Sequence, residues 1–164
     1  MPTENKQTKL LTLVIIHQHT RVLLGMKKKG FGAGRWNGFG GKVESSETIE
    51  QAAIREVQEE AGITVGAIDK CGVITFEFVN EPDKQLEVHI FRATEFTGDP
   101  IETDEMKPQW FAVDEIPFKD MWVDDAYWMP LFLKGKRFRG RFLFDKPSTV
   151  DYQAKIIEHE LKEA

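Results

Sequence analysis

The chain has 164 residues, of which 41% are hydrophobic, so it is long enough for one sizeable core and too short for two comparable ones. Its net charge of −5 argues against a general nucleic-acid binder, because such a protein needs a basic face. No apolar run approaches the roughly 18 residues of a membrane span, and the lone Cys71 excludes an intramolecular disulfide.

Strand and helix patterns both recur along the chain. Residues 1–8 are expected to form a disordered tail, and residues 9–164 a single domain. Alternating or β-branched runs predict strands over 9–17, 21–25, 72–80, 86–96, 109–113 and 137–144. Helices are expected over about 47–61 and 124–133; the last part of the chain alternates like a strand over 150–156 and fits either state over 156–161. These elements predict an α/β fold with a mixed sheet covered on both faces and two main helices.

The segment 41–63, GKVESSETIEQAAIREVQEEAGI, contains the strongest functional signal. On a helix, Glu56 and Glu60 lie on one face with Glu59 between them. Two bare carboxylates about 4 Å apart repel by roughly 4 kcal/mol at an effective dielectric near 20, so a hard divalent cation is expected beside them. The three acids alone are equally compatible with a solvated acidic helix face.

The ends of this helix are also visible in the sequence. Ser46 and Thr48 are both candidate N-caps, and Gln51 stands three residues after Thr48, as a capping box requires. Gly62 is expected to end the helix. Arg55 is placed either to pair with Glu59 one turn later or to position a neighbouring carboxylate.

Glycines precede the acidic helix in the run WNGFGGK, where Gly38, Gly40 and Gly41 let the backbone approach a ligand closely. A glycine loop followed by an acidic helix suits a site for a metal ion and a phosphate chain. Every fixed position of the Nudix box is filled from Gly41 to Ile63, and the chain therefore resembles the Nudix family. The resemblance implies an α/β/α sandwich and a pyrophosphohydrolase that uses Mg²⁺, or Mn²⁺ in its place.

Aromatic and acidic residues outside that motif suggest a purine. Trp122 stands just before Asp124 and Asp125; the indole can stack on a base, and the acids can accept hydrogen bonds from its N–H groups. The alternative is that one of the acids caps the next helix and Trp122 is core. Adjacent carboxylates in an aromatic pocket cannot both ionise cheaply, so one should have a raised pKa, and the pair could share one proton.

The chain also has FEFV at 76–79, DEM at 104–106 and IPFKDMW at 116–122. With these segments it resembles, from about residue 12 to 152, the animal branch of the family that acts on oxidised purine nucleoside triphosphates. The resemblance implies metal ligands at Gly40 (through its carbonyl), Glu56, Glu59, Glu60 and Glu105. It implies substrate contacts from Thr12, Lys27, Phe31, Asn37, Phe39, Gly40, Gly41, Lys42, Phe76, Phe78, Trp122, Val123, Asp124 and Asp125. The general base is expected to be Glu56 or Glu59, with Arg55 in a positioning role. Val123 stands between Trp122 and the acid pair, where the family pattern leads us to expect proline. This difference bears on which damaged base the chain prefers.

The expected reaction is hydrolysis of 8-oxo-dGTP and 2-oxo-dATP to the monophosphate and pyrophosphate, as the resemblance implies. Small-molecule nucleotides are the expected partners, with no nucleic acid polymer and no membrane. A monomer is expected, located in the cytoplasm with a nuclear or mitochondrial fraction. Two alternatives stay open: a Nudix enzyme for another nucleoside diphosphate derivative, and a module that binds nucleotides without cleaving them.

Overall fold

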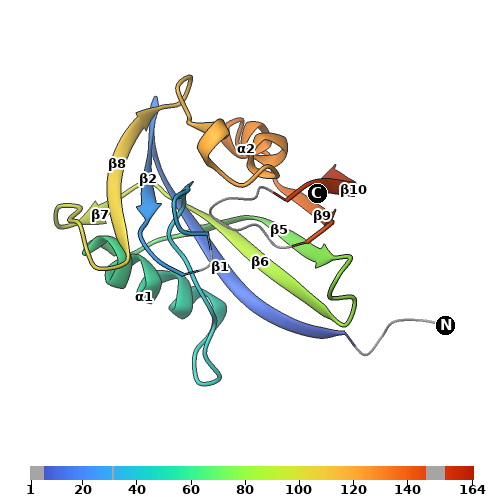
Figure 1. The fold of residues 1–164 in the computed structure, drawn as a ribbon. Helices are drawn as coiled ribbons and strands as arrows, with labels where there is room; N and C mark the ends of the chain where they lie inside the picture. Colours follow the sequence, from blue (N-terminus) through green and yellow to red (C-terminus); the bar gives the residue numbers. More distant parts are fainter. Residues whose placement is uncertain (1–5, 31, 147–153) are drawn as a thin grey trace.

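The computed structural model describes residues 6–30, 32–146 and 154–164. Its main sheet has eight strands in the order β10-β9-β5-β6-β1-β2-β3, with β8 also paired to β2 (Figure 1). These strands are β1 (Gln7–Gln18), β2 (Arg21–Lys27), β3 (Trp36–Asn37), β5 (Asp69–Phe78), β6 (Lys84–Ala93), β8 (Met106–Ala112), β9 (Phe138–Phe144) and β10 (Ile156–Glu163). The pairs β1–β6 and β5–β9 are parallel and the others antiparallel, so the sheet is mixed, as predicted.

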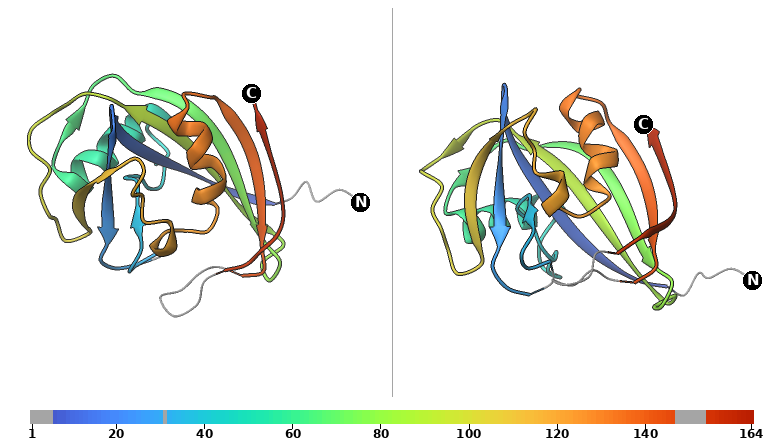
Figure 2. Two further views of the ribbon diagram at one scale, coloured as in Figure 1. Left: turned by 90° about the horizontal axis from the view of Figure 1, so that it is seen from above. Right: turned by 45° about the horizontal axis from the view of Figure 1, so that its top comes forward.

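Among the described residues, two α-helices cover this sheet, α1 (Ile49–Ala61) on one face and α2 (Asp125–Leu133) on the other (Figures 1 and 2). A short 3-10 helix, η1 (Phe118–Asp120), precedes α2, and β4 (Thr64–Val65) pairs with β7 (Phe96–Thr97) in a separate small sheet. The central strand β1 serves both faces: Val14 and Ile16 pack in the core beneath α1, and Ile15 packs in the core beneath α2. The predicted α/β architecture is therefore confirmed.

The ends of α1 follow the sequence closely. The Gln51 amide donates to the Thr48 hydroxyl at 3.0 Å, and the Thr48 amide donates to the Gln51 side chain at 2.8 Å, which confirms the capping box. Gly62 has a left-handed φ of 72° and donates to the Gln58 carbonyl at 3.0 Å. With both ends fixed, the acidic residues of α1 stay in a defined register against the sheet.

Some boundaries differ from the sequence expectations. The strand β1 begins at Gln7, inside the tail predicted for residues 1–8, and residues 1–5 of that tail lie outside the described residues. The segment from Ile156 is a strand, so the helical alternative there is wrong; the part of the predicted strand over 150–153 lies outside the described residues. No helix within the described part of the chain is long and apolar enough to cross a membrane.

Candidate active site

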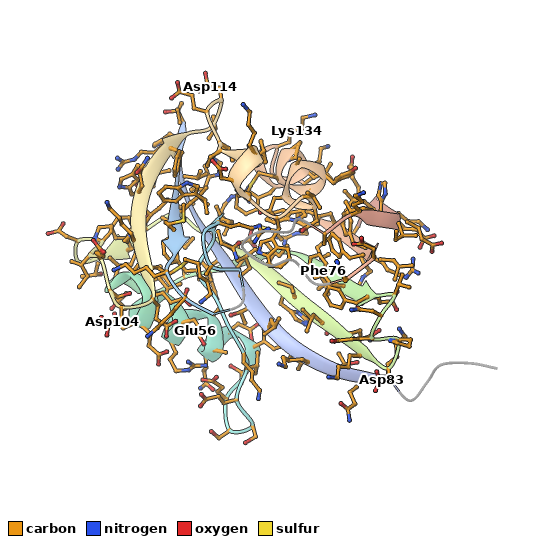
Figure 3. All side chains as sticks on the ribbon, in the orientation of Figure 1. Glu56, Phe76, Asp83, Asp104, Asp114 and Lys134 are labelled. Atoms are coloured by element: carbon orange, nitrogen blue, oxygen red, sulfur yellow. The ribbon has the colours of Figure 1, made fainter. Side chains whose placement is uncertain are left out.

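A cavity of about 350 Å³ lies between the sheet, the acidic face of α1 and the loop that leads into α2. Its lining consists of Leu11, Thr12, Leu13, Lys27, Asn37, Gly38, Gly40, Gly41, Glu56, Glu60, Phe76, Phe78, Leu86, Val88, Glu105, Met106, Trp122, Asp124, Asp125 and Phe144. In Figure 3, Glu56 on α1 and Phe76 on β5 mark two well-separated parts of this lining. The cavity therefore joins an acidic part, beside the glycine loop, to a part lined by aromatic residues and two aspartates.

Most of the predicted site residues meet in this cavity, and a few do not. Phe39 is fully buried in the core beneath α1, because its neighbours Gly38 and Gly40 face the cavity and successive residues of an extended segment point to opposite sides. Lys42 and Glu59 are exposed outside the lining, and Val123 packs against the core beneath α2. Phe31 lies outside the described residues.

The glycine loop lies directly against β1. The Thr12 amide donates to the Gly41 carbonyl at 2.9 Å. A Cβ atom at Gly40 would lie 1.8 Å from the Thr12 carbonyl oxygen, and one at Gly41 would lie 2.4 Å from a Glu56 carboxylate oxygen. Glycine is thus required at Gly40 by contact with the backbone, whereas a side chain at Gly41 would displace the Glu56 carboxylate. The Gly40 amide donates to the Glu60 carboxylate at 3.0 Å.

Arg55 organises the carboxylates around the start of the motif. Its guanidinium donates twice to Glu47, at 3.0 Å and 2.6 Å, and once each to Glu56 at 3.1 Å and Glu59 at 3.3 Å. It also donates to the Lys42 carbonyl at 3.0 Å. The hydrogen bonds to Arg55 lower the pKa of Glu47 to about 2. Both predicted roles of Arg55 are present, and the two-point contact with Glu47 ties the loop to the helix.

The acidic part of the cavity has the chemistry of a cation site. Glu60 is only 4% exposed, and burial raises its pKa to about 8. Burial also raises the pKa of Glu56, against the opposing effect of Arg55. Carboxylates withdrawn from water are stabilised by a nearby positive charge, and oxygen donors suit a hard cation, so these residues fit a divalent ion. Within the described ranges, no group of three acidic, histidine or cysteine side chains is gathered closely enough to hold a metal ion without side-chain movement.

Asp124 and Asp125 form a buried pair in the other part of the cavity. Each is 3% exposed, and the Trp128 indole N–H donates to Asp124 Oδ2 at 2.9 Å. Burial, together with the charge of Asp124, raises the pKa of Asp125 well above its usual range. This direction agrees with the raised pKa expected for one member of the pair. Asp124 occupies the N-cap position of α2 but makes no capping side-chain hydrogen bond, so the alternative in which it serves as that cap is wrong.

Several lining residues were not anticipated from the sequence. Leu11, Leu13, Leu86, Val88 and Phe144 form apolar lining contributed by β1, β6 and β9. In the sequence they are ordinary strand residues. Only the strand order β9-β5-β6-β1 brings them to one cavity.

The chain matches the NUDIX domain model over residues 8–132. It belongs to the Nudix family. A relative from Danio rerio, named oxidized purine nucleoside triphosphate hydrolase, is 56% identical over 156 residues, which cover 95% of this chain and 96% of the relative. A relative of the same name from Mus musculus is 55% identical over 152 residues, covering 92% of this chain and 97% of the relative.

Among solved structures, the crystal structure of the mutator MutT protein from Bacillus halodurans has a TM-score of 0.79 and 27% sequence identity, covering 93% of this chain and 97% of that one. The Nudix fold and the prediction of a hydrolase of this family are thus confirmed. Nudix hydrolases generally use divalent metal ions, which agrees with the oxygen-rich acidic part of the cavity.

The aspartate pair should make the stability of the folded chain depend on pH. Because the pKa of Asp125 is raised in the folded state, its favourable contribution is complete below its unfolded pKa of 3.8 and is lost as the pH rises through the folded pKa. The variant Asp125→Asn cannot lose a proton. We expect its free energy of unfolding, relative to that of the unsubstituted chain, to increase between about pH 5 and about pH 8. The increase should be about 1.4 kcal/mol for each pH unit over which Asp125 is protonated in the folded chain and ionised in the unfolded chain.

Urea unfolding in the presence of a chelator measures this difference without interference from metal binding. The matched control is Asp120→Asn, because Asp120 is an exposed aspartate in η1 close to the pair in sequence. A stability difference for Asp125→Asn that is the same at both pH values would contradict a raised pKa at this position.

Proposed function

We propose that this chain hydrolyses oxidised purine nucleoside triphosphates, including 8-oxo-dGTP and 2-oxo-dATP, to the nucleoside monophosphate and pyrophosphate. The observation that supports this most directly is the pairing of two chemistries in one cavity. Glu56 and Glu60 line its acidic part, and the buried pair Asp124–Asp125 lines its aromatic part. The names of the zebrafish and mouse relatives, which match nearly the whole chain, support the same substrate class.

The proposed ion is Mg²⁺, or Mn²⁺ in its place, held by Glu56, Glu60 and Glu105, with Glu59 and the Gly40 carbonyl as further ligands. Glu56, Glu60 and Glu105 line one cavity, which supports this set, while Glu59 would have to turn away from Arg55 to join it. When bound, the ion would neutralise phosphate oxygens and lower the pKa of a bound water.

Glu56 is the proposed general base, which would take a proton from the attacking water through a carboxylate oxygen that the ion does not occupy. Its support is its place in the cavity lining and its contact with Arg55 at 3.1 Å, which fixes the carboxylate without removing it from the cavity. Glu59 remains the alternative base, and its side chain is 56% exposed outside the lining. Arg55 is proposed to orient both carboxylates.

The nucleoside would occupy the aromatic part of the cavity. Trp122 is proposed to stack on the base, and Asp124 and Asp125 to bind its polar edge. Asn37, Thr12, Phe76 and Phe78 are proposed to surround the nucleoside, with Lys27 directed to the phosphates. All of these line the cavity, whereas Phe39, Lys42 and Val123 do not, so we assign those three no contact with substrate. Phe31 stays a prediction.

We also propose that residues 9–164 act as a single domain and as a monomer, on free nucleotides and not on nucleic acid polymers. The proposed location is the cytoplasm, with a nuclear or mitochondrial fraction. A lone cysteine, Cys71, which is buried, suits such reducing compartments.

The decisive experiment is a panel of normal and oxidised nucleoside triphosphates with Mg²⁺, scored by kcat/KM and by products. We expect the oxidised purines to be preferred and the products to be monophosphate and pyrophosphate. A higher kcat/KM for a nucleoside diphosphate linked to another group would favour a different Nudix activity. Tight binding of the oxidised nucleotides without turnover would favour the binding module.

A further inference from the structure

The loop between β7 and β8 closes over the C-terminal end of α1. The Ile101 amide donates to the Ala61 carbonyl at 2.9 Å, and the Thr103 hydroxyl donates to the Glu60 carbonyl at 3.0 Å. Both carbonyls belong to the last turn of the helix, where no helical amide can reach them. The loop therefore serves as a cap for the same turn that carries Glu60 into the cavity.

The Thr103 hydroxyl also binds the part of the loop that leads into β8, at Glu105 and Met106. Its oxygen accepts from the Glu105 amide at 3.3 Å and from the Met106 amide at 3.3 Å, and the Thr103 amide donates to the Met106 carbonyl at 2.9 Å. A hydroxyl has one donor and two acceptor positions, so all three are used. A second contact, from the Lys28 amide to the Glu105 carbonyl at 2.9 Å, fixes Glu105 from the opposite direction.

We propose that Thr103 is a positioning residue that sets Glu105 opposite Glu60 across the acidic part of the cavity. Glu105 is not on α1, so its distance from the helical acids depends on how the loop is attached to the helix. The hydroxyl makes that attachment by joining the backbone of Glu60 to the backbone of Glu105. This inference rests on the proposed function, because it takes Glu60 and Glu105 as ligands of one divalent ion.

The test is to measure the affinity of the full chain for Mn²⁺, without nucleotide, by electron paramagnetic resonance or calorimetry. Thr103→Val keeps the shape of the side chain and removes the hydroxyl. Because loss of a group that orients a metal ligand typically weakens metal affinity 10- to 100-fold, we expect about tenfold weaker Mn²⁺ binding. Thr103→Ser keeps the hydroxyl and should restore the affinity, whereas Thr103→Ala, a second variant in case valine prevents folding, should not.

Thr64→Val is the matched control. The Thr64 hydroxyl donates to the Gln58 side chain near the same end of α1, at 2.8 Å, and makes no contact with Glu105. Its loss should leave Mn²⁺ affinity unchanged. An equal loss of Mn²⁺ affinity in Thr64→Val and Thr103→Val would show that both act only by loosening the helix end, and it would overturn the inference.

A double-variant cycle separates this inference from the proposed function. If Thr103 acts through Glu105, Thr103→Val should weaken Mn²⁺ binding in the unsubstituted chain and have no further effect once Glu105→Gln is present. Additive effects would overturn the positioning role while leaving Glu105 as a ligand. Unchanged Mn²⁺ affinity in Glu105→Gln alone would instead overturn the proposed ligand set on which the inference rests.

Discussion

Replacing Glu60 by glutamine is expected to abolish most of the hydrolysis of oxidised purine nucleoside triphosphates while leaving the fold intact. The glutamine side-chain oxygen can still accept the Gly40 amide, which now donates to Glu60 at 3.0 Å, so the glycine loop should keep its place. What disappears is a negative charge at the proposed cation. Metal-ion catalysis typically stabilises the transition state by several kcal/mol. If losing this ligand charge removes about 4 kcal/mol of that stabilisation, kcat/KM should fall about a thousandfold.

Glu50→Gln is the matched control, because Glu50 is an exposed glutamate in the first turn of the same helix. Both variants should show the same thermal unfolding midpoint within a few degrees, and only Glu60→Gln should lose activity. A Glu60→Gln variant with near-normal kcat in saturating Mg²⁺ would remove Glu60 from the proposed ligand set. Comparison with Glu59→Gln, whose side chain is 56% exposed and bound to Arg55, then shows whether activity follows burial in the cavity.

The local features of the acidic segment were predictable because each depends on near neighbours in sequence. The capping box needs only Thr48 and Gln51, and the left-handed end needs only Gly62. The contact between Arg55 and Glu59 follows from the helical repeat. By contrast, the two-point contact of Arg55 with Glu47 spans the start of the helix, and no periodic rule relates a loop residue to a helical one.

The aromatic part of the cavity was predictable only in part. Trp122 and the two aspartates stood out because an indole beside paired acids is chemically unusual. Phe39 was expected to contact substrate but is buried outside the cavity lining, because the sequence does not show which side of an extended glycine-rich segment faces the cavity. Leu86 and Phe144 were missed for a related reason: their roles depend on the parallel pairing of β5 with β9 and of β1 with β6, which joins strands far apart in sequence.

Thr103 belongs to the same class of missed residue. In the sequence it is one polar residue in the run ETDEM, with no spacing that relates it to α1. Its importance follows from three-dimensional contacts alone. Its hydroxyl donates to the carbonyl of Glu60, which lies 43 positions earlier in the chain, and accepts from the amide of Glu105. Sequence patterns therefore located the acids of α1, whereas only the fold shows that Thr103 holds Glu105, an acid outside the helix, in place beside them.

Asp124→Asn is expected to narrow the range of oxidised purines that the chain hydrolyses. In the folded chain both carboxyls are buried, and their raised pKa values favour one shared proton. A pair that can move this proton can present a donor or an acceptor at a given position, and so meet either an oxo or an amino group on a base edge. Asparagine at 124 fixes that position, because its amide cannot exchange roles with its oxygen by moving a proton.

The measurement is kcat/KM for 8-oxo-dGTP and for 2-oxo-dATP, compared as a ratio so that general losses cancel. A hydrogen bond to a charged group contributes about 1.5–3 kcal/mol, so the ratio should change by at least about tenfold. Asp120→Asn, on the exposed side of η1, should leave the ratio unchanged. If Asp124→Asn lowers both values equally, the pair binds the base without choosing between donor and acceptor, and substrate range must come from the shape of the surrounding aromatic lining.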